Sequence, residues 1–138
     1  MSRIIAGAAG GVRLASVPGD NTRPTTDRVK ESLFSKLESY DLLRDARVLD
    51  AFGGSGALGC EALSRGAASV TLLDTYPKAV AVIRRNVEAV QKAMGGKAAG
   101  SVVLYYVEPE EPADGDGPAD DSADETNPHH FDTAEVTA

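Results

Sequence analysis

The chain has 138 residues, of which 14 are Lys or Arg and 21 are Asp or Glu, and 42% are apolar with only 5% aromatic. This length fits one small domain, a single cysteine (Cys60) excludes an internal disulfide, and no apolar run approaches the roughly 18 residues of a membrane span. Residues 4–9 are too short and too glycine-interrupted for a signal-peptide core. We therefore expect a cytoplasmic protein and exclude a secreted scaffold or a membrane protein.

Charge is divided unevenly along the chain. Residues 1–90 hold 12 basic and 10 acidic side chains, whereas residues 91–138 hold 2 basic and 11 acidic ones. Within the first 30 residues, five basic side chains face only Asp20 and Asp27. Because a basic segment attracts polyanions and an acidic segment repels them, any contact with nucleic acid is expected near the N-terminus.

The first predicted elements are a hairpin and a helix. Residues 3–18 alternate weakly and contain three glycines, which predicts two small strands. Thr25, Thr26 and Asp27 are good capping residues, and the apolar residues that follow recur at helical spacing, which predicts a helix over about 27–39. We group residues 1–45 as an N-terminal segment of hairpin and helix.

Strands and helices alternate from residue 46. A buried strand over 47–52 runs into a glycine turn, a helix from about Ser55 ends at Gly66, and a second strand covers 69–74. The next helix has Thr75 as its cap and stops at Gly95, and a third strand covers 101–107. This order predicts an α/β core over residues 46–107 with a parallel sheet.

The rest of the chain has a different composition. Residues 108–127 contain nine carboxylates, three prolines and two glycines, with no large apolar side chain to offset the entropy of ordering. We expect residues 108–130 to form a disordered acidic insert or tail. Residues 131–138 contain only the start of another strand.

The glycine turn carries the main functional signal. Residues 54–59 match the pattern GxGxxG between a strand and a helix, where backbone N–H groups can hold a polar ligand. Asp74 ends the next strand, 18 residues beyond Gly56, where a carboxylate can accept from both hydroxyls of a ribose. Together these features predict a nucleoside ligand.

Asp50 bears on which nucleoside binds. It ends the first strand of the core, where a dinucleotide's pyrophosphate would approach and be repelled by the carboxylate. S-adenosylmethionine has no phosphate and carries an ammonium and a sulfonium, which a carboxylate attracts directly or through water. Asp50 could instead cap the following helix or bind loop amides. The charge argument favours the methyl donor, and a nicotinamide-dependent oxidoreductase is a less favoured alternative.

Five short stretches of sequence, one of which contains the glycine turn, match a known family together. They occur in order, without gaps, between Arg3 and about Asn86: Arg3–Gly7, Thr22–Thr25, Asp27–Glu31, Asp50–Gly59 and Glu61–Ala67. Together they resemble the RsmD family of bacterial 16S ribosomal RNA guanine-N2 methyltransferases. The resemblance implies a Rossmann-like S-adenosylmethionine-dependent methyltransferase fold with an N-terminal hairpin extension, acting on ribosomal RNA or the assembling small subunit.

The resemblance also implies roles for individual residues. The donor's amino-acid moiety would lie against Asp50, Phe52, Gly54, Ser55 and Gly56, its ribose would bind Asp74, and residues 22–28 would close over donor and RNA. RNA phosphates would contact four arginines, although an exposed arginine is often only solvated: Arg3, Arg13, Arg23 and Arg28. We expect no metal and no membrane contact, and a monomer if the protein is completely folded.

The family's acceptor motif is absent from this sequence. In the family a fourth strand ends in Asp or Asn followed by Pro-Pro-Tyr, which holds the guanine amino group and stacks on the extruded base. Phe131 and Asp132 resemble the opening of that strand, but no such tetrapeptide occurs in the 138 residues, so we assign no catalytic residue. We expect the apparent truncation to leave the third strand with an exposed edge.

Two hypotheses therefore compete. The chain is either the N-terminal part of an rRNA guanine-N2 methyltransferase or a noncatalytic remnant that still binds donor or RNA.

Overall fold

The computed structural model describes residues 2–19, 26–51, 54–95 and 101–108, together with the strand at 131–136. The sequence predictions for Arg23, Phe52 and residues 109–130 lie outside these ranges. The elements in chain order are β1 (Ser2–Arg3), β2 (Arg13–Leu14), α1 (Asp27–Ser39), β3 (Arg47–Asp50), α2 (Ala57–Ser64), β4 (Ser69–Asp74), α3 (Pro77–Ala93), β5 (Ser101–Val107) and β6 (Phe131–Val136).

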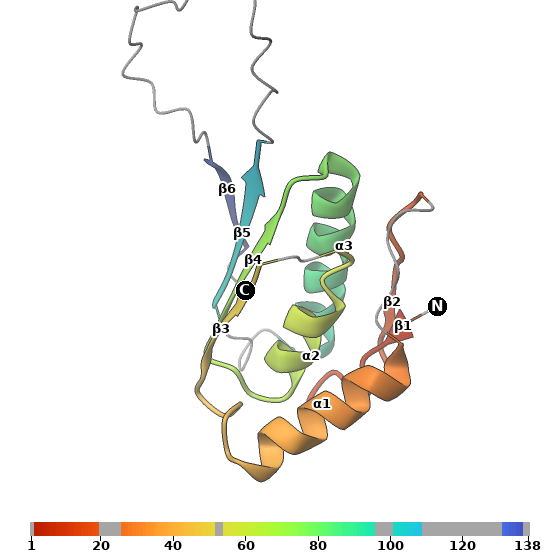
Figure 1. The fold of residues 1–138 in the computed structure, drawn as a ribbon, viewed down its shortest axis with the longest axis vertical. Coiled ribbons are helices and arrows are strands. Elements are labelled where there is room, and N and C mark those ends of the chain that lie inside the picture. Colours follow the sequence, from red (N-terminus) through yellow and green to blue (C-terminus); the bar gives the residue numbers. More distant parts are fainter. Residues whose placement is uncertain (1, 20–25, 52–53, 96–100, 109–130, 137–138) are drawn as a thin grey trace, which may run out of the picture.

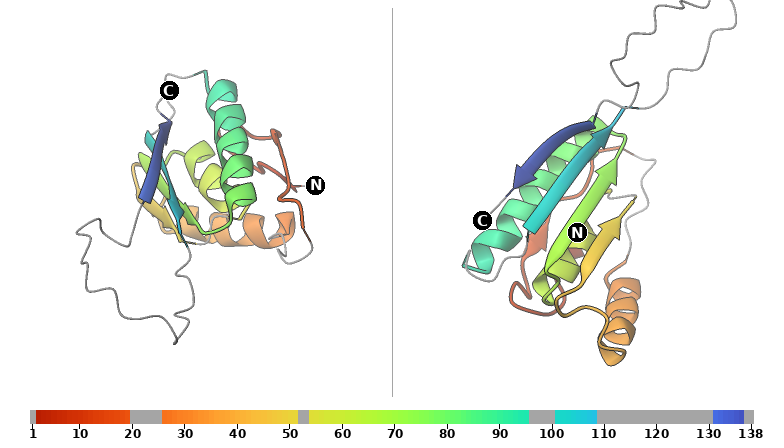
Figure 2. Two further views of the ribbon diagram at one scale, coloured as in Figure 1. Left: turned by 90° about the horizontal axis from the view of Figure 1, so that it is seen from above. Right: turned by 90° about the vertical axis from the view of Figure 1, so that its left-hand side faces the viewer.

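A four-stranded sheet in the order β3-β4-β5-β6 forms the base of the fold (Figure 1). β3, β4 and β5 are parallel, which confirms the predicted alternation of strands and helices. α2 and α3 lie on one face of the sheet, and the β1–β2 hairpin lies beyond them, farther from the sheet (Figure 2). α1 runs crosswise below them, from the β3 side of the sheet to the hairpin, and packs against α2.

The edge of β5 differs from the sequence expectation. β6 pairs with β5 in antiparallel register from Val107↔Phe131 to Val102↔Val136, so the prediction of an exposed edge on the third strand is wrong. The strand that begins at Phe131 therefore does not extend the sheet as another parallel strand. An unpaired strand edge offers a row of hydrogen-bonding groups, and a chain that reverses direction can pair with it without a crossover helix.

The opposite edge of the sheet is more open. Among the described strands β3 pairs only with β4, and its Leu49 is 65% exposed. An apolar groove of about 490 Å³ runs between α1 and β3, lined by residues that include Leu33, Leu37 and Leu42. Parallel strands are normally covered on both faces, and here α2 and α3 cover one face (Figure 2). Leu73 and Val103 alternate with the buried residues of β4 and β5 and are only half-buried.

Local sequence chemistry explains where the helices begin. Thr26 caps α1, with its Oγ1 accepting from the N–H of Val29 at 3.3 Å, as the sequence predicted. α2 begins at Ala57 and not at Ser55, because Gly54 and Gly56 have φ of +55° and +79°, outside the helical region. The cap of α3 is Tyr76 and not the predicted Thr75, since Pro77 takes the first helical position.

One core joins the N-terminal segment to the α/β unit. Ile4 and Leu14 from the hairpin and Phe34 from α1 belong to the same buried cluster as residues of α2, α3 and the sheet. Cys60 is 1% exposed within this cluster, and burial raises the pKa of its thiol to about 12, so the thiol stays protonated. Cys60 thus packs as a small apolar residue of the core.

Candidate functional site

Two carboxylates lie at the carboxyl ends of adjacent strands of the sheet. Asp50 is the last residue of β3 and Asp74 is the last residue of β4, and the parallel register places Asp50 opposite Leu72. Both are half-buried. Ligands of open α/β sheets bind in the crevice beyond the carboxyl ends of the strands, so the carboxyl ends of β3 and β4 are the candidate site.

Asp74 holds the glycine loop, residues 54–59, next to the carboxyl end of β4. The N–H of Gly54 donates to Asp74 Oδ2 at 2.8 Å, and the N–H of Tyr76 donates to Asp74 Oδ1 at 2.9 Å. Each carboxylate oxygen has a further lone pair, so the same side chain can still accept from ligand hydroxyls. The structure thus brings Asp74, Gly54, Ser55 and Gly56 together beside the end of β3.

The glycines of the loop are required by close packing as well as by backbone conformation. A Cβ on Gly56 would lie 3.3 Å from Ile83 Cγ1, and a Cβ on Gly59 would lie 2.8 Å from Leu72 Cδ2 and 3.0 Å from Val70 Cγ1. Gly59 therefore lets α2 approach β4, the role of the last glycine in a nucleotide-binding turn.

Substitution of Gly59 with alanine is expected to lower the free energy of unfolding by about 1–3 kcal/mol, because the added methyl overpacks the contact with β4. Chemical denaturation measures this loss. Leu72→Ala removes the clashing branch, so the double variant should lose less stability than the sum of the two single variants. Additive losses would show that the Gly59 contact is not the cause.

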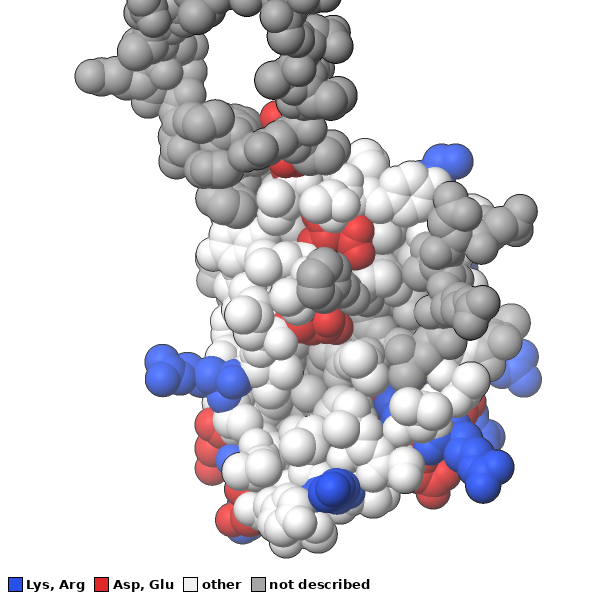
Figure 3. Space-filling model, viewed as in Figure 1, with Lys and Arg blue, Asp and Glu red and all other residues white. Residues whose placement is uncertain are grey.

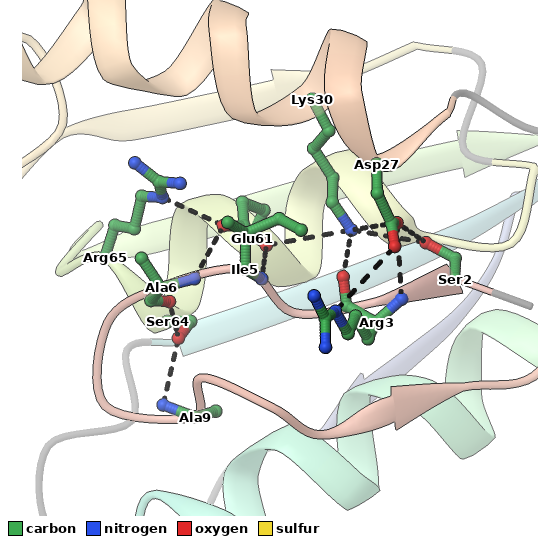
Figure 4. Close-up of polar contacts among 10 residues, drawn as sticks. All are labelled: Ser2, Arg3, Ile5, Ala6, Ala9, Asp27, Lys30, Glu61, Ser64 and Arg65. Atoms are coloured by element: carbon green, nitrogen blue, oxygen red, sulfur yellow. Dashed lines mark hydrogen bonds and ion pairs between the residues drawn. The ribbon is translucent and has the colours of Figure 1, made fainter.

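A buried charge cluster fixes the hairpin to α2 (Figure 4). Glu61 and Lys30 are both fully buried, and Lys30 Nζ lies 3.7 Å from Glu61 Oε2. Glu61 also accepts from Arg65 Nε at 2.9 Å and from the N–H groups of Ile5 at 2.9 Å and Ala6 at 3.2 Å. One carboxylate therefore joins α1, α2 and the chain that follows β1.

The cluster continues to the start of α1. Lys30 donates to the carbonyl of Arg3, and Asp27 accepts from Ser2 Oγ at 3.0 Å. Desolvation raises the pKa of Asp27, but the hydrogen bonds from Ser2 and Arg3 and the nearby positive charges outweigh it, so the net shift is downward. Because its pKa is lowered in the fold, ionised Asp27 stabilises the folded state at pH values above 3.8, its ordinary pKa. This contribution is lost as the pH falls through the lowered pKa.

Sequence reasoning missed this cluster. The available signal was a carboxylate, Glu61, within the otherwise apolar run of α2. Arg65 pairs with Glu61 and with Glu38 at 3.4 Å and lies over the Phe34 ring, 5.5 Å from its centroid.

Three of the four predicted RNA-contacting arginines lie within the described residues. Arg3 and Arg13 are directly opposite each other in the β1–β2 ladder, and both are exposed. Arg28 is exposed in the first turn of α1, next to Asp27, whose carboxylate is 4.0 Å from Arg3 Nε. Basic side chains gather at the lower right of Figure 3, over the hairpin and the start of α1.

A third segment also reaches the glycine loop. Asn86 of α3 is buried, and its Nδ2 donates to the carbonyl of Ser55 at 2.7 Å. The sequence signal was a polar residue on the helix face that carries Ile83, Val87 and Val90. This contact adds α3 to the elements that position the loop.

In the described part of the chain, no three His, Cys, Asp or Glu residues are grouped so that they could hold a metal ion. None of the helices described is both long enough and apolar enough to cross a bilayer.

A family model described as "Conserved hypothetical protein 95" matches residues 2–104. The chain belongs to this family. The resemblance to RsmD is confirmed by relatives named "Ribosomal RNA small subunit methyltransferase D". That of Haemophilus influenzae is 42% identical over 89 residues, covering 64% of this chain and 45% of the relative. That of Escherichia coli K12 is 51% identical over 72 residues, covering 52% and 35% respectively.

These relatives are longer than the chain. The matched segments span less than half the length of the RsmD relatives. A solved structure described as "Putative methyltransferase yhhF from Escherichia coli" is 27% identical with a TM-score of 0.53, over 80% of this chain and 86% of that chain. A second solved structure, of a hypothetical protein from Thermus thermophilus, is 26% identical with a TM-score of 0.58, over 78% and 86%. The Rossmann-like methyltransferase fold is confirmed.

Proposed function

We propose that this chain binds S-adenosylmethionine at the crevice between Asp50, Asp74 and the glycine loop. It would be the donor-binding part of an RsmD-type enzyme that methylates guanine N2 in the ribosomal RNA of the small subunit. The observation that carries the proposal is the pair of carboxylates at adjacent strand ends beside backbone loop amides. The RsmD relatives are named as ribosomal RNA small subunit methyltransferases, which supports the substrate class.

The chemistry of the site matches a cationic nucleoside. Asp50 would attract the donor's ammonium and sulfonium, and Asp74 would accept from its ribose while it holds the N–H of Gly54. A diphosphate would meet these two negative charges at close range, which disfavours a nicotinamide cofactor. Phe52, outside the described residues, stays a predicted donor contact.

S-adenosylmethionine held at this site would supply an electrophilic methyl group on its sulfonium. Guanine N2 would take that methyl by direct displacement, with the bonding electron pair left on sulfur and one proton lost from N2. Alignment of the two reactants can be worth about 7–11 kcal/mol, so the acceptor must also be held. Asp50, Asp74 and the glycine loop supply the donor side of that alignment.

The hairpin would supply contacts to RNA. Arg3 and Arg13 are directly opposite each other, and like charges in this arrangement repel. The Asp27 carboxylate, 4.0 Å from Arg3 Nε, offsets part of this repulsion. Phosphates of ribosomal RNA or of the assembling small subunit would provide further negative charge. Arg28 would extend the contact along α1, and Arg23 stays a prediction outside the described residues.

A second candidate is a protein that binds donor or RNA without turnover. It would hold donor or RNA at the same surfaces but would not transfer the methyl group.

Isothermal calorimetry with S-adenosylmethionine, S-adenosylhomocysteine and NAD tests the donor site. We expect the first two to bind and NAD to show no binding; binding of NAD alone, or of none of the three, would contradict the proposed site. A methyl-transfer assay on unmodified small-subunit particles then separates the two candidates. Turnover supports the enzyme, and donor binding without turnover supports the noncatalytic protein.

Substitution of Arg13 with glutamine is expected to weaken the binding of RNA by a similar factor for every nucleotide sequence, because phosphate contacts do not depend on the bases. The slope of log K against log salt should fall by about 0.7–0.9 for each phosphate that the variant no longer neutralises. The stability of the fold should stay unchanged or rise slightly, since a like-charge pair is removed. Arg44→Gln is the matched control, because Arg44 is also exposed but pairs with Asp41 at the far end of α1. Equal slopes for both variants would exclude the hairpin as an RNA contact.

A further inference from the structure

The side chain of Asn86 occupies a place where an apolar residue would be expected. It is 2% exposed and lies on the face of α3 that packs into the core with Ile83, Val87 and Val90. A buried amide costs free energy unless its donors and acceptors are paired. The position of its partners therefore shows what the residue does in the fold.

Those partners belong to two other segments. Asn86 Nδ2 donates to the carbonyl of Ser55 at 2.7 Å and to the carbonyl of Ala15 at 3.0 Å. Asn86 Oδ1 accepts from the N–H of Ala15 at 2.7 Å. Ser55 lies within the glycine loop, and Ala15 follows the last residue of β2 directly. One side chain thus connects the candidate donor loop with the candidate RNA-binding hairpin.

Both connections act on the backbone. Ser55 stands between two glycines with positive φ, so its peptide has few conformational restraints of its own, and the Asn86 bond fixes its carbonyl. Ala15 is bonded through both its N–H and its carbonyl, as a residue in a sheet would be. Arg13 lies two residues earlier, in register with Arg3.

We propose that Asn86 is a positioning residue that couples the glycine loop to the hairpin, so that donor and RNA strengthen each other's binding. The proposal rests on the proposed function, because it assumes that the loop binds donor and the hairpin binds RNA. A ligand that shifts or rigidifies the Ser55 peptide changes the Asn86 amide, and with it the position of Ala15. Such coupling is reciprocal, so RNA must raise donor affinity by the same factor by which donor raises RNA affinity.

The variant Asn86→Asp tests this coupling at constant shape. A carboxylate can still accept from the N–H of Ala15, but it cannot donate to the carbonyls of Ser55 and Ala15. Calorimetry would measure the affinity for S-adenosylhomocysteine with and without a 16S ribosomal RNA fragment. In the natural chain we expect the RNA fragment to raise the affinity for S-adenosylhomocysteine at least about fivefold. In the variant we expect about tenfold weaker binding of S-adenosylhomocysteine and no effect of RNA.

Val87→Ala is the matched control. Val87 is the next residue of α3, equally buried at 2% exposed, and its truncation removes core packing without touching the polar link. It should lower the unfolding midpoint and leave the coupling factor unchanged. Retained coupling in Asn86→Asp, or equal loss of coupling in both variants, would overturn the proposal.

A measurement on the natural chain does not depend on how well the variants fold. Binding of S-adenosylhomocysteine should increase the hydrogen-exchange protection of the Ala15 amide, and unchanged protection would overturn the coupling. If the natural chain binds no S-adenosylhomocysteine at all, the proposed function fails together with this inference. If it binds both ligands independently, only the coupling fails.

Discussion

Replacement of Glu61 with glutamine is expected to lower the free energy of unfolding by about 3–5 kcal/mol, because it removes the buried carboxylate 3.7 Å from the fully buried Lys30 ammonium. Only the Asp27 carboxylate then remains near Lys30 Nζ, at 3.8 Å, and its side chain is 36% exposed. The new amide also directs donor groups toward the N–H groups of Ile5 and Ala6, which donate to the carboxylate in the natural chain. Urea denaturation followed by circular dichroism measures the loss. Glu31→Gln, the same change at an exposed position of α1, should alter stability by less than about 0.5 kcal/mol.

The origin of this loss can be tested by removing the other partner. In Lys30→Met/Glu61→Gln no uncompensated ammonium remains, so the double variant should be more stable than the sum of the single effects predicts. Additive effects would mean that Lys30 and Glu61 do not interact energetically. A loss of under about 1 kcal/mol in Glu61→Gln would mean that the cluster does not hold the hairpin in place.

The elements of the core could be predicted because their signals are local. Thr26 before a run of helical apolar spacing sets the start of α1, and the alternation of apolar strands with capped helices from residue 46 specifies the parallel sheet. The glycine pattern likewise predicted the sharp turn beside Asp74, because positive φ and close packing leave little choice of residue. The start of α1 and the glycine turn are indicated by a few consecutive residues, and the sheet type is indicated by the order of the elements.

The parts that sequence reasoning missed depend on contacts between distant segments. Glu61 contacts Ile5 across 56 residues, and Asn86 contacts Ala15 across 71 residues. A polar residue on an apolar helix face indicates that a partner exists, but not which segment provides it. The pairing of β6 with β5 was missed for a similar reason, since a strand pattern does not specify the edge with which the strand pairs.

Replacement of Asp74 with alanine is expected to weaken the binding of S-adenosylmethionine by about 10- to 100-fold. The carboxylate would accept from the donor's ribose, and hydrogen bonds to a charged group are each worth about 1.5–3 kcal/mol. The substitution also releases the N–H groups of Gly54 and Tyr76, which hold the loop against β4. S-adenosylhomocysteine has the same ribose, so calorimetry should give an equal factor for both ligands.

Asp50 should behave differently, and the contrast tests the charge argument directly. Asp50→Asn keeps the shape at the end of β3 and removes the negative charge that would face the ammonium and the sulfonium. S-adenosylmethionine carries both cationic groups and S-adenosylhomocysteine carries only the ammonium, so the first ligand should lose more affinity than the second. Asp41→Asn, at an exposed position between α1 and the start of β3, should change neither affinity. If Asp50→Asn weakens both ligands equally, the carboxylate acts on the ammonium alone; if it weakens neither, the assignment of Asp50 to the donor site is wrong.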